Sequence, residues 1–170
     1  MFLVLACVSM AASAQSSVII SEFLAHNTGG LVDEDGDYSD WIELYNGGAT
    51  AVNLGGWYLT DDAANLTKWA FPSTNIAAKG FMVVFASGKD RRVAGLPLHT
   101  SFGLASGGEY LALVMPDGVT IATEFSPMYP EQFADISYGL IQSITTTYFV
   151  TSNSAAKVFV PTGPVSGNWT

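Results

Sequence analysis

Short apolar runs recur along the chain from Val18 to Leu140, and Gly, Asn, Asp and Pro separate them. Helical periodicity is nearly absent, and this spacing is typical of a sandwich or barrel of short strands. The pattern predicts eight strands, over residues 18–25, 40–46, 51–60, 67–71, 80–87, 109–115, 119–125 and 135–140. We therefore expect an all-β domain made of two packed sheets.

Alternation within the runs predicts which side chains fill the core. In DWIELYN (40–46), Trp41 and Glu43 fall on one face and Ile42 and Leu44 on the other, because successive side chains point to opposite sides of a strand. The same interpretation gives an expected core of Ile20, Phe23, Ile42, Leu44, Trp57, Leu59, Phe71, Val83, Phe85, Leu111, Leu113 and Ile121. The pair Asp117-Gly118 between two apolar runs predicts a tight antiparallel hairpin.

The two ends of the sequence differ from this pattern. Residues 1–14, MFLVLACVSMAASA, are apolar and end in Ala-Ser-Ala, so we expect a secretory signal peptide that is cleaved after Ala14. The domain is expected over residues 17–140, with a closing strand that extends to about 150. Residues 151–170 are expected to be a linker or the start of a following domain, which makes the sequence a fragment of a longer protein.

Composition excludes several classes of partner. Asp and Glu outnumber Lys and Arg by 15 to 6, and the net charge of -9 argues against nucleic acid, which clustered cations bind. After the signal no run reaches the 18 or so apolar residues of a membrane span. The only cysteine, Cys7, lies in the signal, so the mature chain has no disulfide and no thiolate metal site.

The strongest candidate site is the stretch DEDGDYSDWIEL (33–44), which contains six carboxylates. Asp33, Asp35, Asp37 and Asp40 are placed to offer oxygen ligands to a calcium ion, and their mutual repulsion favours a cation between them. The spacing is not that of an EF-hand, which requires Gly and Glu where Tyr38 and Leu44 stand. A solvated acidic loop and a catalytic carboxylate pair are the alternatives.

Signals of catalysis are weak. A glycosidase-like acid needs burial to raise its pKa, whereas these acids lie in a polar loop, and no Gly-x-Ser-x-Gly motif is present. His26 and His99 lack a second ligand at metal spacing, so we expect them at the surface or in turns. We therefore expect no enzyme and no certain cofactor, with calcium as the one candidate.

Three tryptophans lie in separate predicted strands, at Trp41, Trp57 and Trp69. Core packing is the expected role for such residues. The alternative, a stacking platform for carbohydrate, needs two of them exposed on one face. Asp62, which follows a predicted strand, is expected to cap the next loop through backbone amides.

Several segments together resemble the lamin tail domain as it occurs in secreted bacterial proteins. They are Ser21-Glu22-Phe23, the acidic stretch with DWIELYN, Leu54 to Asp61, Trp69 to Pro72, Gly80 to Lys89 and Leu104 to Gly118. The resemblance covers roughly residues 17–140 and implies an immunoglobulin-like antiparallel β-sandwich. The closing motif of the family is replaced after Tyr148-Phe149 by Val-Thr-Ser-Asn-Ser-Ala-Ala.

The resemblance implies a non-catalytic interaction or structural module, located outside the cell and tethered to further domains of a larger secreted protein. It names no ligand, which leaves both protein and carbohydrate as partners. The alternative function is a calcium-dependent carbohydrate-binding module in which the acidic loop orders a ligand face.

Overall fold

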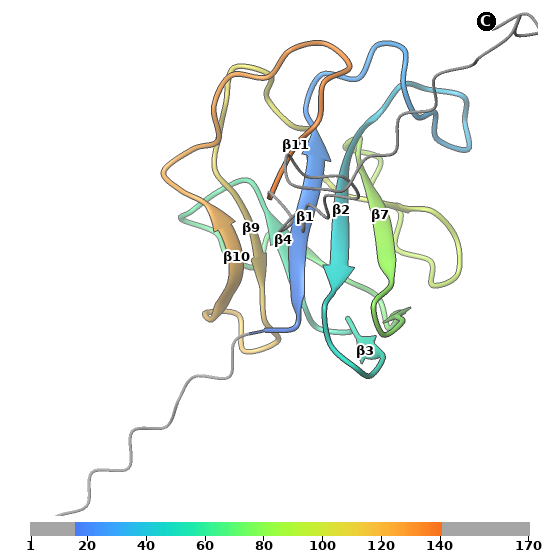
Figure 1. Cartoon of the computed structure of the whole chain (residues 1–170), viewed down its shortest axis with the longest axis vertical. Coiled ribbons are helices and arrows are strands. Elements are labelled where there is room, and N and C mark those ends of the chain that lie inside the picture. The colour runs from blue at the N-terminus through green and yellow to red at the C-terminus, as the bar shows by residue number, and fades with distance from the viewer. Residues whose placement is uncertain (1–15, 141–170) are drawn as a thin grey trace, which may run out of the picture. The chain divides into compact units, whose positions relative to one another are not determined.

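The computed structural model describes residues 16–140, and these residues form eleven strands and no helix (Figure 1). The strands are β1 (Val18–Leu24), β2 (Asp40–Asn46), β3 (Val52–Asn53), β4 (Tyr58–Thr60), β5 (Trp69–Ala70), β6 (Asn75–Ile76), β7 (Phe81–Ala86), β8 (Leu98–His99), β9 (Leu111–Val114), β10 (Ile121–Phe125) and β11 (Tyr138–Gly139). The expected signal peptide and the expected segment 151–170 lie outside the described residues.

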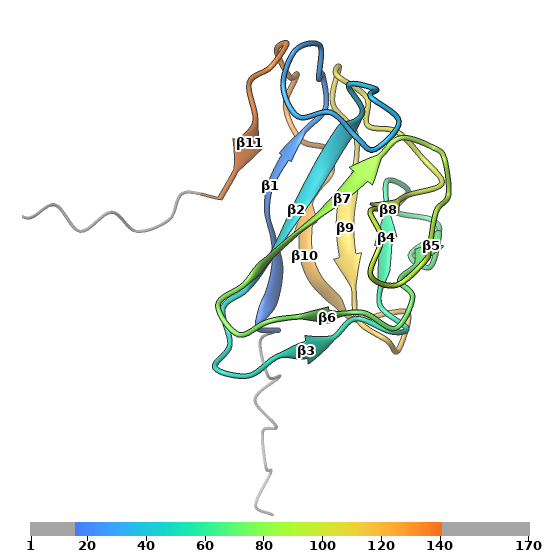
Figure 2. The same ribbon diagram turned by 90° about the vertical axis from the view of Figure 1, so that its right-hand side faces the viewer.

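Two sheets form the layers of a sandwich. The first has the strand order β11-β1-β2-β7-β8 and the second the order β10-β9-β4-β5. Figure 2 shows β1 and β2 on one side of the domain and β4 and β5 on the other. The short pair β3-β6 lies at the end of the sandwich opposite the loop that precedes β2 (Figure 2).

The core lies between the two layers. Phe23, Ile42 and Leu44 from the first sheet are fully buried, as are Leu59 and Leu113 from the second. Each such side chain stabilises the fold by about 1.5–3 kcal/mol relative to the exposed state. Hydrophobic burial between the sheets is therefore the main source of stability in this cysteine-free part of the chain.

All eight predicted strand regions contain strand, and the bounds of β2 agree with the prediction. The predicted strand 51–60 is two strands, β3 and β4, because a turn with Gly56 at φ +83° separates them. The strands β6 and β8 were not predicted, since two residues give no period. The pair β7-β8 is parallel, whereas the other strand pairs among the described residues are antiparallel.

Two of the expected core residues are wrong. Val83 is only partly buried, because Val84 and Ala86 are the residues of β7 that belong to the core cluster. Ile121 is 38% exposed at the start of the edge strand β10. Phe85 is buried, but it packs against the ring of His99 and does not belong to the central cluster.

The predicted hairpin is confirmed between β9 and β10. Asp117 accepts hydrogen bonds from the N–H groups of Val119 (3.0 Å) and Thr120 (2.8 Å), and Gly118 has φ +73°. No helix among the described residues is long and apolar enough to cross a membrane.

Candidate functional site

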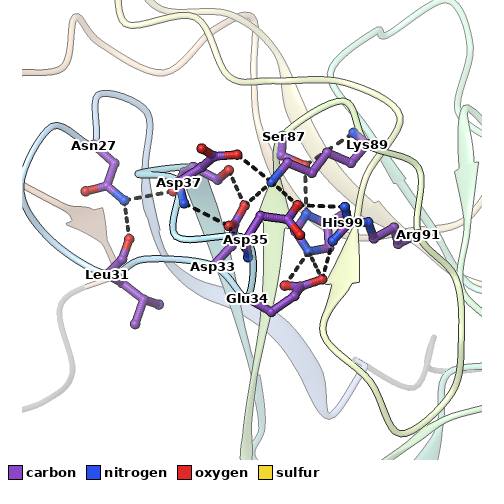
Figure 3. A network of polar contacts seen from close by, with 11 residues as sticks. Asn27, Leu31, Asp33, Glu34, Asp35, Asp37, Ser87, Lys89, Arg91 and His99 are labelled. Atoms are coloured by element: carbon purple, nitrogen blue, oxygen red, sulfur yellow. Dashed lines mark hydrogen bonds and ion pairs between the residues drawn. The ribbon is translucent and has the colours of Figure 1, made fainter.

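The register between β2 and β7 brings two distant loops together. Asp40, the first residue of β2, lies opposite Ala86, the last residue of β7. The acidic loop (residues 33–39), which leads into β2, therefore lies beside the β7–β8 connection (residues 87–97), as Figure 3 shows. The site is built from these two loops and from β8.

Asp33 organises the acidic loop. Its side chain is fully buried, and its Oδ1 accepts hydrogen bonds from the N–H groups of Asp35 (3.0 Å) and Asp37 (3.1 Å). Its backbone N–H donates to the carbonyl of Asp37 (2.9 Å), and its carbonyl accepts from Gly36 (3.0 Å). Gly36 has φ +85°, a conformation that costs glycine little. The loop is thus folded around one carboxylate.

Lys89 from the β7–β8 connection reaches into the acidic loop. Its Nζ lies 2.6 Å from Asp33 Oδ2, 2.7 Å from Asp35 Oδ2 and 2.8 Å from Asp37 Oδ2 (Figure 3). An ammonium group has three N–H donors, and each of the three carboxylates can accept one of them. These aspartates are also the three whose oxygens lie within 4.8 Å of one another, a spacing that a metal ion could bridge.

Arg91 adds a second cation at the edge of the same cluster. Its Nη1 lies 2.6 Å from Glu34 Oε1 and its Nη2 lies 2.6 Å from Asp35 Oδ2. Charge-assisted pairs of this kind are the stronger hydrogen bonds of proteins, although exposure weakens them. Two cations of one loop therefore bind four carboxylates of the other.

His99 in β8 is a buried member of this cluster. Its side chain is fully buried, its Nε2 lies 2.9 Å from Glu34 Oε2, and its ring stacks on Phe85 at 5.1 Å between centroids. The prediction that His99 is a surface or turn residue is therefore wrong, because His99 is a buried residue of β8, a strand too short to be predicted from the sequence. His26 is exposed, as predicted.

Ser87, His99 and Glu34 form a chain of hydrogen bonds that resembles the order of a hydrolase triad. Ser87 Oγ lies 2.8 Å from His99 Nδ1. A serine hydrolase also needs free N–H groups for an oxyanion and a base that substrate can approach. The N–H groups of Gly88 and Lys89 are bonded to Phe102 O and Ser87 Oγ, and the His99 ring is buried. The hydrogen bonds between Ser87, His99 and Glu34 therefore serve to hold the acidic loop against the β7–β8 connection.

Asp40 lies apart from the other predicted calcium ligands. Its Oδ1 accepts the backbone N–H of Asn27 (3.0 Å), and Asn27 Nδ2 donates to the carbonyls of Leu31 (2.6 Å) and Ser39 (2.8 Å). Burial raises the pKa of Asp40. The structure therefore brings Asp33, Asp35 and Asp37 together and uses Asp40 to fix the end of the preceding loop.

Hydrogen bonds and ion pairs lower the pKa of three carboxylates of the site, Asp33, Glu34 and Asp35. Burial by itself would raise the pKa of Asp33, but the hydrogen bonds from Lys89 and Ser39 outweigh it and hold that pKa well below its ordinary value. The Arg91 guanidinium lowers the pKa of Asp35, and His99 lowers that of Glu34. The same aspartates raise the pKa of Lys89.

Sequence reasoning missed Lys89, Arg91 and His99 as members of the site. The two cations could have been identified from the distribution of positive charge along the sequence, because three of the six Lys and Arg residues lie within 89–92. An acidic stretch with few cations in the chain is expected to attract the one group of cations available. His99 has no such signal in the sequence.

The tryptophans do not form an exposed platform in the described residues. Trp57 and Trp69 are buried in the core, as expected, and Trp69 Nε1 donates to Asp90 Oδ1 (3.1 Å). Trp41 is partly buried on the opposite face of its sheet from Ile42. The predicted cap at Asp62 is confirmed, since its Oδ1 accepts the N–H of Ala64 (2.8 Å).

Comparison with known proteins agrees with this architecture. A family model, described as Lamin Tail Domain, matches residues 11–126. No curated protein matches the chain. The matched segment contains β1 to β10, the acidic loop and the β7–β8 connection, and the all-β sandwich agrees with the immunoglobulin-like fold of the family. The chain belongs to the lamin tail domain family.

Proposed function

We propose that this chain is a non-catalytic interaction and structural module that works outside the cell, as one domain of a larger secreted bacterial protein. The family supports an immunoglobulin-like interaction module. The apolar segment before Gln15 and the absence of cysteine after it support export without disulfides.

The observation that carries the interaction role is an exposed apolar segment, residues 133–140. All eight residues are exposed, and they include Phe133 (66%), Ile136 (61%) and Leu140 (47%). The carboxylate of Asp135 accepts the N–H groups of Thr28 (2.7 Å) and Gly29 (2.9 Å), which fixes this segment beside the loop that follows β1. Large apolar side chains gathered at the surface are typical of protein interaction sites.

Site-specific cross-linking tests this role. A cysteine placed at Ile136 in the otherwise cysteine-free mature protein would carry a photoreactive label, and a cysteine at Val119, which is 70% exposed in the β9–β10 hairpin, is the matched control. In the secreted protein, the Ile136 label is expected to form discrete cross-linked products and the Val119 label few. Equal products at both positions, or none at either, would contradict the proposal.

Export is tested separately. Mass spectrometry of protein recovered outside the cell is expected to give a mature chain that begins at Gln15. A retained Met1 on the exported protein would count against this route.

A calcium-dependent carbohydrate-binding module is the second candidate, and the spacing of Asp33, Asp35 and Asp37 favours it. Against it stand the buried Trp57 and Trp69, which cannot stack on a sugar, and the ammonium group of Lys89, which lies between the three aspartates. Isothermal titration of oligosaccharides in the presence of calcium and of chelator tests this role. Heat of binding that requires calcium would support the second candidate over the first.

A further inference from the structure

We infer that Lys89 is a built-in counter-cation, which occupies the position between Asp33, Asp35 and Asp37 and clasps the acidic loop to the β7–β8 connection. The inference goes beyond the proposed function, because it concerns what closes this end of the domain whatever the domain binds. It also predicts how the acidic loop responds to divalent cations.

The ammonium group of Lys89 contacts all three aspartates at once. The three contacts of Nζ, at 2.6, 2.7 and 2.8 Å, go to three different carboxylates and use all three N–H donors. A calcium ion in the same place would need six to eight oxygen ligands at about 2.3–2.6 Å. An ammonium group and a calcium ion cannot share this position, so one excludes the other.

The Asp33 carboxylate already has a full set of hydrogen bonds within the protein. Its Oδ1 is already bonded to two backbone N–H groups, and its Oδ2 accepts both Lys89 Nζ and Ser39 Oγ (2.7 Å). This fully buried carboxylate has its hydrogen-bonding capacity filled by the protein itself. The turn is thus folded before any metal ion arrives.

Lys89 comes from a part of the chain far from the acidic loop. It is 52 to 56 residues distant in sequence from the aspartates that it binds, and only the β2-β7 register brings it there. Its side chain is 21% exposed, whereas the Asp37 side chain is 64% exposed. Removal of the ammonium would therefore leave a preformed, partly open cluster of three carboxylates, which is the ligand chemistry that calcium prefers.

Thermal melts of the whole mature chain, with calcium chloride or with chelator, test this inference. The melting temperature of the wild type is expected to stay unchanged up to about 1 mM calcium, a range in which extracellular modules bind the ion. The variant Lys89→Met is expected to melt at a lower temperature in chelator, and its melting temperature is expected to rise with the logarithm of the calcium concentration. Lys79→Met is the matched control, because exposed Lys79 donates to the carbonyl of Gly47 and forms no ion pair with any residue that the structure describes, and neither effect is expected there.

A triple variant covers the case in which Lys89→Met fails to fold. Lys89→Met combined with Asp35→Asn and Asp37→Asn is expected to recover part of the melting temperature and to ignore calcium, because two of the unpaired charges are gone. The inference is overturned if the wild type responds to calcium as strongly as Lys89→Met does. It is also overturned if Lys89→Met melts like the wild type in chelator, or if the triple variant still responds to calcium.

Discussion

Asn46, the last residue of DWIELYN, has a structural role that alanine substitution would expose. Its side chain is fully buried at the end of β2. Its Nδ2 donates to the carbonyls of Thr50 (2.8 Å) and Ala77 (3.0 Å), and its Oδ1 accepts the N–H of Gly48 (2.9 Å). One amide thus joins the loop after β2 to the segment between β6 and β7.

The expected cost follows from these three bonds. A neutral hydrogen bond contributes about 1 kcal/mol, so Asn46→Ala is expected to lower the free energy of unfolding by about 3 kcal/mol. Urea denaturation followed by tryptophan fluorescence measures this loss. Asn46→Asp is the informative companion, because it keeps an acceptor for Gly48 but turns a carboxylate towards two carbonyls, and we expect it to cost more. A loss below about 0.5 kcal/mol for Asn46→Ala would refute this account of the amide.

Two further predictions concern the core and the acid response. Leu113→Ala, at a fully buried position of β9, is expected to cost about 2–5 kcal/mol in urea denaturation, whereas Val119→Ala at the exposed hairpin is expected to stay within about 0.5 kcal/mol; equal losses would show that the core is misplaced. Stability is expected to fall as the pH drops below about 4, because carboxylates whose pKa is lowered by folding contribute stability above their unfolded pKa and lose it as they are protonated. Among the residues that the structure describes, the pKa is lowered for five carboxylates, Asp33, Glu34, Asp35, Asp117 and Asp135, and raised for Asp40. A urea midpoint at pH 3 equal to that at pH 7 would therefore contradict the prediction.

The alternation of the sequence predicted β2 well and β7 poorly, for a physical reason. In DWIELYN, polar or amphipathic residues alternate with Ile42 and Leu44, so the buried face is defined. In FMVVFA every residue is apolar, and both faces of β7 contact protein. The sequence of this strand therefore does not show which alternate residues face the core. The assignment of Val83 to the core in place of Val84 follows from this loss of information.

The acidic loop was recognisable from the sequence, and its partner was not. Six carboxylates in eleven positions require compensation by cations or by water, which local sequence makes plain. Which cation supplies it depends on the pairing of Asp40 with Ala86, a contact between strands distant in the chain. The grouping of three cations within residues 89–92 narrows the choice of partner, but only the structure shows that Lys89 and Arg91 bind the acidic loop, whereas Arg92 pairs with Asp90.

A double-mutant cycle between Lys89 and Asp33 tests the central claim most directly. Free energies of unfolding would be measured for the wild type, Lys89→Met, Asp33→Asn and the double variant, in chelator and at low salt. The account predicts strong coupling, so that the double variant loses clearly less stability than the sum of the two single losses. Additive losses would show that the ammonium and the buried carboxylate do not act on each other, and would contradict the inference that Lys89 holds the two loops together.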